Sequence, residues 1–142
     1  MFRRECKGDD RMEHVKTYTI VERDIDELGH MNYLKYVKHF EIARFEWLNT
    51  IGISFDEMVA KQLGLVLLKF DTEYAKEVRL GDTVEIHTKL LKLGTKSFTV
   101  EQIMYHEDAI ASKSRVIKTV MDLQTRKAIP VPSEIVNAFN PQ

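Results

Sequence analysis

Apolar residues between positions 33 and 51 recur at spacings of three and four, which is the period of a helix with one buried face. The spacing predicts one long helix over Tyr33–Ile51, with Asn32 capping its start and Gly52 following its end. Such a helix is about 30 Å long at roughly 1.5 Å per residue. The residues expected to face the core are Tyr33, Tyr36, Val37, Phe40, Ala43, Trp47, Leu48 and Ile51.

The rest of the chain alternates between apolar and polar positions, which indicates β-strands. Strands are expected over residues 15–21, 65–76, 83–90, 97–106 and 115–123. The short connections between the later strands favour antiparallel neighbours. Short helical turns are expected at Phe55–Gln62 and after Pro132. The sequence therefore predicts an α+β domain in which an antiparallel five-stranded sheet wraps around one long helix.

The composition describes one ordinary globular domain. The chain has 142 residues, of which 44% are hydrophobic and 30% are charged, and this is enough for a single hydrophobic core. We expect a disordered N-terminal tail over residues 1–13, because this stretch is polar and mixed in charge, and a single domain over residues 14–142. The net charge of −1 gives no excess positive field for binding nucleic acid.

Cysteine usage and hydropathy bear on the compartment in which the chain works. Cys6 is the only cysteine, so the chain forms no internal disulfide, and a cytoplasmic location is expected. No apolar run reaches the roughly 20 residues that a membrane span needs. The histidines form no HxH or HExxH pattern, and neither a metal nor another cofactor is expected.

The segment from Asp24 to Tyr33 combines two carboxylates, a glycine turn and a predicted helix start. A carboxylate can act as a base or a nucleophile, and the unpaired N–H groups at a helix start stabilise developing negative charge. This combination suits attack on an acyl carbonyl. The residues also fit a simpler interpretation, in which Asp26 forms turn hydrogen bonds, Asn32 is only a cap and His30 is a surface side chain.

The ten-residue segment contains the run Asp26-Glu27-Leu28-Gly29-His30-Met31-Asn32-Tyr33, and Phe40-Glu41 and Ala43-Arg44 follow on the predicted helix. This pattern resembles that of the hot dog fold acyl-CoA thioesterases, in particular the 4-hydroxybenzoyl-CoA thioesterase-like family. Segments 79–82, 96–98 and 129–132 also match the family, so the resemblance covers about residues 15–139.

The resemblance implies a hot dog fold and hydrolysis of an acyl-CoA thioester without a metal or cofactor. It implies that Asp26 attacks the thioester carbonyl or activates water, and that the Tyr33 backbone N–H polarises that carbonyl. It also implies that the substrate is bound by Gly29, His30, Asn32 and Lys96, the last through the CoA 3′-phosphate. The family assembles its site at a dimer seam, so a homodimer or homotetramer is expected.

Two other functions stay open on the sequence alone. An enoyl-CoA hydratase or dehydratase on the same fold would also use an aspartate and a histidine, although the spacing of Asp26 and His30 fits that pattern poorly. A non-catalytic module that binds acyl-CoA is the other alternative. Gly94 and Thr95 stand where 4-hydroxybenzoyl-specific enzymes carry basic residues, so that acyl group is not expected. The sequence leaves open which acyl group is used and whether CoA or acyl carrier protein holds it.

Overall fold

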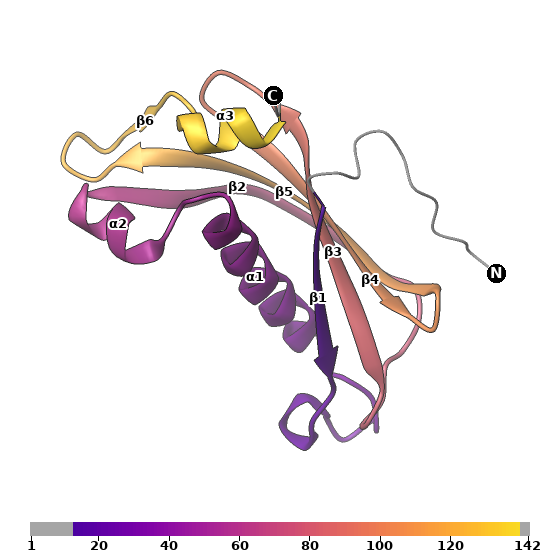
Figure 1. The fold of residues 1–142 in the computed structure, drawn as a ribbon. Helices are drawn as coiled ribbons and strands as arrows, with labels where there is room; N and C mark the ends of the chain where they lie inside the picture. The colour runs from indigo at the N-terminus through magenta and orange to yellow at the C-terminus, as the bar shows by residue number, and fades with distance from the viewer. Residues whose placement is uncertain (1–12, 140–142) are drawn as a thin grey trace.

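A curled antiparallel sheet wraps around one long helix, α1, in the computed structural model, which describes residues 13–139 (Figure 1). The main path of the sheet follows the order β1-β3-β4-β5-β2, and a short further strand, β6, pairs with β5. The expected α+β hot dog architecture is confirmed. The strands are β1 (His14–Thr19), β2 (Leu63–Tyr74), β3 (Thr83–Leu93), β4 (Phe98–His106), β5 (Ala109–Asp122) and β6 (Lys127–Ile129).

Helix α1 (Tyr33–Thr50) is the helix that the apolar spacing predicts, one residue shorter at its C-terminal end. Asn32 caps its start, because the side-chain oxygen accepts a hydrogen bond from the N–H of Leu34. Gly52 follows its end with a φ of +95°, a left-handed conformation that glycine adopts without steric cost. The sequence therefore fixes both ends of α1 locally.

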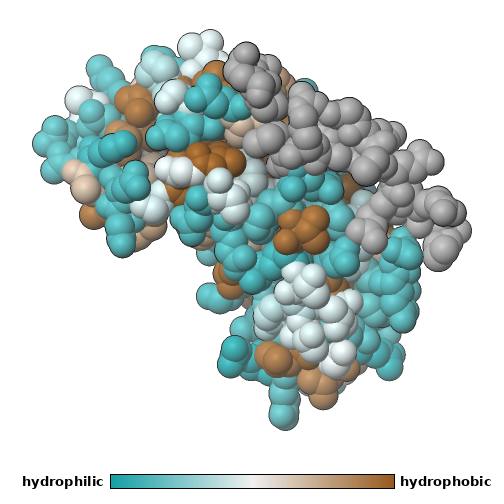
Figure 2. Space-filling model, in the orientation of Figure 1, coloured by the Kyte–Doolittle hydropathy of each residue, from teal (hydrophilic) through white to brown (hydrophobic). Residues whose placement is uncertain are grey.

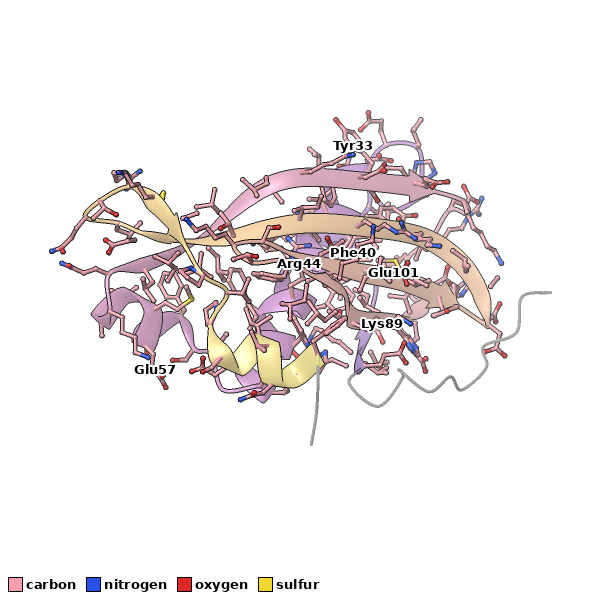
Figure 3. All side chains as sticks on the ribbon, turned by 90° about the horizontal axis from the view of Figure 1, so that it is seen from above. Tyr33, Phe40, Arg44, Glu57, Lys89 and Glu101 are labelled. Carbon is pink, nitrogen blue, oxygen red and sulfur yellow. The ribbon has the colours of Figure 1, made fainter. Side chains whose placement is uncertain are left out.

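The buried face of α1 differs from the prediction at several positions, and Val37 and Ile51 are only half-buried. Tyr33 is 60% exposed, because it lies in the first turn, beside Tyr74 at the end of the edge strand β2. His39 and Arg44 are buried although both are polar. Each makes a polar contact, which makes such burial tolerable: His39 pairs with a carboxylate, and Arg44 donates to Gln102 over 2.9 Å. Figure 3 shows Arg44 beside Phe40 in the middle of the molecule and Tyr33 at its margin.

The hydrophobic core divides into two clusters along α1. The first lies around the N-terminal half of the helix and includes Ile20, Met31 and Phe40. The second lies around the C-terminal half and includes Trp47 and Phe98. The first cluster contains Met31, one residue before the helix cap, and so it anchors the loop that enters α1.

Strands β3 and β5 are longer than the sequence pattern predicts, whereas β1 and β4 are slightly shorter and β2 has the predicted length. Strand β5 begins at Ala109 rather than at residue 115, because a tight turn at Glu107 and Asp108 starts a hairpin with β4. Both turn residues have positive φ, of 52° and 67°, which suits the twist of a two-residue hairpin. Strand β6 is absent from the sequence-based prediction, since it has only three residues and no periodicity of its own.

The short elements complete the chain. They are the 3₁₀ turn η2 (Glu22–Asp24) and the helices α2 (Phe55–Ala60) and α3 (Ser133–Phe139). The expected N-terminal tail falls, apart from Glu13, outside the described residues. Between residues 13 and 139, no helix has the length and apolar character needed to cross a membrane.

The buried face of α1 can be tested by shortening one of its core side chains. Phe40 is fully buried, so Phe40→Ala should lower the free energy of unfolding by about 3–5 kcal/mol, through lost burial and the cavity left behind. Urea denaturation followed by circular dichroism measures this change. The control is Ile42→Ala on the same helix, where the side chain is 36% exposed. Equal losses in the two variants would contradict the assignment of the buried face.

Candidate functional site

The segment from Asp24 to Asn32 folds back on itself as a closed loop, which lies at the foot of β1 in Figure 1. Ile25 and Met31 form an isolated antiparallel bridge, and the N–H of Asn32 donates to the carbonyl of Asp24 over 2.9 Å. Gly29 makes the reversal possible with a φ of +86°. The closed loop brings Asp26 back beside the start of α1.

The two aspartates of this loop have different environments. Asp24 is only 3% exposed, and its carboxylate accepts hydrogen bonds from Val21 N–H and Tyr18 Oη, each over 3.0 Å. Burial alone would raise the pKa of Asp24, but the hydrogen bonds from Val21 and Tyr18 and the pairing with His39 lower it below its ordinary value. Asp24 is therefore a fully engaged structural carboxylate rather than a reactive one.

Asp26 lies at the surface of the loop and is half-buried. Its Oδ1 accepts a hydrogen bond from Leu28 N–H over 2.9 Å, and its Oδ2 accepts one from Asn32 Nδ2 over 3.2 Å. These two contacts fix the direction of the carboxylate without enclosing it. Asp26 can still reach a ligand that approaches from solvent.

Asn32 links this carboxylate to the start of α1. Its Nδ2 holds Asp26, and its Oδ1 accepts a hydrogen bond from Leu34 N–H over 2.9 Å. Asp26 thus forms the turn hydrogen bond that the simpler interpretation expects, and Asn32 caps the helix. Among residues 13–139, the N–H of Tyr33 has no hydrogen-bond partner. This free donor lies at the positive end of an 18-residue helix, next to the residue that holds the Asp26 carboxylate.

An aromatic wall borders the helix start. Tyr74, at the end of β2, donates its hydroxyl to the carbonyl of Tyr33 over 3.2 Å. The Tyr74 ring meets the rings of Tyr33 and Tyr36 edge-on, at centroid distances of 6.4 and 5.1 Å. Sequence analysis missed Tyr74, because it comes from a strand far along the chain and no local pattern connects it with the loop.

The His30 ring pairs with Glu77 rather than with the Asp26 carboxylate. Its Nδ1 lies 3.2 Å from an oxygen of Glu77, in the connection between β2 and β3, and Arg79 binds the other oxygen of that carboxylate. Hydrogen bonds from Arg79 and His30 lower the pKa of Glu77. Sequence analysis did not identify Glu77 as a partner of His30 or of Arg79. The histidine ring therefore helps to tie the loop to the β2–β3 connection.

Lys96 lies far from Asp26 within one chain. The Asp26 loop adjoins the start of β3, since Ile20 pairs with Asp82, whereas Lys96 follows the end of β3. Strand β3 has 11 residues and separates the two by about 30 Å at roughly 3.3 Å per residue. Figure 1 shows these two ends of the sheet at opposite ends of the molecule. Lys96 is therefore not part of the Asp26 loop environment within one chain.

The site has no metal-binding character in the part of the chain that the structure describes. No three His, Cys, Asp or Glu side chains gather there in an arrangement that could hold an ion. What the loop offers instead is a directed carboxylate, an unpaired helix N–H and an aromatic border. Chemically, this arrangement can accept a proton from water or attack an electrophile while the helix start binds the developing anion.

Comparison with known proteins places the chain among thioesterases. Residues 21–139 match the family model of the thioesterase-like superfamily. The acyl-CoA thioester hydrolase YbgC of Escherichia coli O6:H1 is 28% identical over 117 residues, which cover 82% of this chain and 87% of YbgC. The long-chain acyl-CoA thioesterase FadM of E. coli K12 is 26% identical over 113 residues, which cover 78% of this chain and 85% of FadM.

The fold also matches solved structures. The Staphylococcus aureus protein SAV2348, determined in complex with CoA, superposes with a TM-score of 0.83 at 22% sequence identity. The match covers 89% of this chain and 80% of SAV2348. At this identity the likeness concerns the fold.

The double role of Asn32 can be tested through stability. Asn32→Ala removes the cap and should lower the free energy of unfolding by about 1 kcal/mol. Asn32→Ser keeps a capping oxygen and loses only the donor to Asp26, so its stability should stay within about 0.5 kcal/mol of the unmodified protein. Urea denaturation compares the two. A serine variant as unstable as the alanine variant would show that the Asp26 contact, rather than the cap, carries the stability.

Proposed function

The chain belongs to the thioesterase-like superfamily, and we propose that it is an acyl-CoA thioesterase in which Asp26 attacks the thioester or activates water. The observation that carries the mechanism is the side chain of Asn32, which holds the Asp26 carboxylate with one end and caps α1 with the other. A carboxylate and an unpaired helix N–H are thereby kept adjacent. The relatives YbgC and FadM, named for acyl-CoA hydrolysis, support the substrate class.

The thioester carbonyl oxygen points at the N–H of Tyr33, where the helix dipole favours the negative charge of the tetrahedral intermediate. One such donor typically contributes about 3 kcal/mol to lowering the barrier. In the nucleophilic route, an Asp26 oxygen bonds to the carbonyl carbon, CoA leaves as the thiolate, and water then hydrolyses the mixed anhydride. In the general-base route, Asp26 takes a proton from the water that attacks. Both routes yield a carboxylic acid and CoA.

The aromatic wall gives the acyl group an apolar border beside the reacting carbon. Tyr33 is largely exposed and Tyr74 is 44% exposed, so both rings have area free to contact a ligand. Gly29 and His30 shape the loop on the other side, where His30 is fixed by Glu77. Asn32 acts on the substrate through the position of Asp26.

We infer a homodimer or homotetramer, because β2 lies at one edge of the sheet with an apolar surface. Leu67 and Leu68 on this strand are 52% and 57% exposed. Proteins rarely leave such an edge uncovered, since its free N–H and C=O groups pair readily with another strand. On the side that Figure 2 shows, hydrophobic residues form separate patches among hydrophilic ones.

The hydratase alternative gains no support from the geometry. An aspartate and histidine acting together would have to face one substrate, whereas the His30 ring is paired with Glu77. Incubation with an enoyl-CoA, followed by the absorbance of the conjugated double bond, tests for hydration beside thiol release. Tight binding of acyl-CoA without thiol release would instead favour the non-catalytic binding module.

Replacing the reacting carboxylate tests the mechanism. Asp26→Asn should reduce kcat by about 10²–10⁴-fold, because an amide neither attacks nor accepts a proton, while the amide can keep its hydrogen bond to Leu28. Hydrolysis of a panel of acyl-CoA substrates is followed by colorimetric thiol detection. The control is Glu27→Gln, which removes an exposed carboxylate from the same loop and should keep full activity. A fully active Asp26→Asn variant would exclude this mechanism.

The edge strand provides a test of assembly. The unmodified protein should elute with the mass of a dimer or tetramer, and the double variant Leu67→Lys, Leu68→Lys should shift towards the monomer, because lysines oppose strand pairing. Size-exclusion chromatography with light scattering measures the mass. Val15→Lys, on the opposite edge strand β1 at a residue 47% exposed, is the matched control. Dissociation by Val15→Lys alone would place the interface on β1.

A further inference from the structure

Three elements meet at the buried carboxylate of Asp24. From β1, Tyr18 donates its hydroxyl to Oδ2, and at the entry to η2 the N–H of Val21 donates to the same oxygen. From α1, His39 Nε2 lies 3.2 Å from Oδ1. Asp24 is 3% exposed and His39 is 5% exposed, so these contacts are shielded from water. A shielded hydrogen bond is electrostatically stronger than one in water.

This carboxylate is connected to the reacting groups by the backbone. The carbonyl of Asp24 accepts the N–H of Asn32, and Asp26 follows only two residues later. Any displacement of Asp24 therefore moves both ends of the loop that carries Asp26. His39 belongs to the same helix whose first N–H serves as the proposed oxyanion donor. The contact between His39 and Asp24 thus fixes the loop relative to α1.

The chemistry of His39 favours the neutral ring. Its Nε2–H can donate to Asp24, while Nδ1 is buried with no hydrogen-bond partner among the described residues. A protonated ring would leave an N–H donor unpaired in the interior. Tyr18 packs against the ring at a centroid distance of 3.9 Å.

Burial and the nearby charges have opposing effects on the pKa of His39, and burial is the largest of them. Burial lowers the pKa of His39, Asp24 raises it in part, and the nearby Lys35 of α1 and Lys16 of β1 lower it further. Arg23 of η2 acts on the neighbouring Tyr18, whose pKa it lowers. The net direction is downward, so the neutral ring is the form present at neutral pH.

We propose that Tyr18, Asp24 and His39 form a positioning clamp that holds Asp26 and the start of α1 in register for thioester hydrolysis. The proposal rests on the proposed function, because it takes Asp26 as the reacting carboxylate. None of the three clamp residues touches the substrate. They act through Asp26 and Asn32, and a misplacement of about 1 Å is enough to cost roughly 10²-fold in rate.

The clamp should respond to acid. In an open state, in which the contact between His39 and Asp24 is broken, water reaches His39. The pKa of His39 then returns towards 6.5, above its value in the closed state, in which the contact is intact. The closed state therefore binds a proton less readily than the open state. Its stability is fully present above pH 6.5 and falls as the pH drops from 6.5 towards the lowered pKa.

Steady-state kinetics on the full chain tests the positioning role. His39→Phe keeps a ring against Tyr18 but removes the donor to Asp24, and kcat should fall by about 10–100-fold with KM within about twofold. His39→Gln restores an Nε2–H donor that does not titrate, and kcat should recover to within about threefold of the unmodified enzyme. The matched control is His106→Phe at the end of β4. This change removes a partly buried histidine whose Nε2 lies 3.6 Å from Asp82 Oδ1, and it should leave kcat unchanged.

A second readout does not depend on activity. Hydrogen exchange at the Asn32 amide reports the bond to Asp24 directly, because this N–H exchanges when the loop opens. After correction for intrinsic rates, exchange in the unmodified protein should accelerate below pH 6.5. His39→Phe should exchange faster at every pH, and His39→Gln should lose the additional acid response.

The results of these experiments distinguish a failure of the clamp proposal from a failure of the thioesterase proposal. If Asp26→Asn is inactive while a folded His39→Phe keeps normal kcat and normal exchange at Asn32, the clamp is refuted and the thioesterase proposal stands. A His39→Gln variant as impaired as His39→Phe also refutes it, because the donor to Asp24 is then irrelevant. If the unmodified protein cleaves no thioester, the function fails and hydrogen exchange still tests the clamp. Should His39→Phe not fold, Tyr18→Phe takes its place, and unchanged kcat and exchange refute the proposal.

Discussion

The burial of one face of α1 against the concave sheet is the constraint on which the rest of the structure depends. Phe40, Ala43 and Trp47 are fully buried there, and together with the neighbouring core residues they fix the rotation and axial position of the helix. Because close-packed interiors tolerate little displacement, the N-terminus of α1 has one defined position. The candidate site is built on that position, because Asp26 is held by the residue that caps the helix and the proposed oxyanion donor is the first N–H of the helix.

The short polar loop before the helix uses each of its side chains for a separate task. Asp24 is buried and ties the loop to β1 and α1, whereas Asp26 is half-buried and forms its hydrogen bonds within the loop and with Asn32. Asn32 joins the two functions, because one amide group serves both the helix cap and the Asp26 contact. Of two aspartates only two residues apart, the buried one is structural, and the half-buried one is the carboxylate that we propose as the reacting group.

The sequence by itself determined the elements that depend on local patterns. The three-and-four spacing of apolar residues set the length of α1, and Asn32 and Gly52 set its ends, because caps and periodicity involve only neighbouring residues. The run from Asp26 to Tyr33 likewise located the carboxylate and the helix N–H. Their adjacency could be predicted because only a short loop separates them.

Only the tertiary structure decided what residues distant in the chain do to one another. Tyr74 borders the site from a strand about 40 residues beyond Tyr33, and His39, which reads as a polar residue on an apolar helix, is buried because Asp24 reaches it from η2. Lys96, which is predicted to bind the CoA 3′-phosphate, lies about 30 Å from Asp26, the length of β3 at roughly 3.3 Å per residue. Such placements follow from strand order and packing, which are long-range properties that no local pattern of residues encodes.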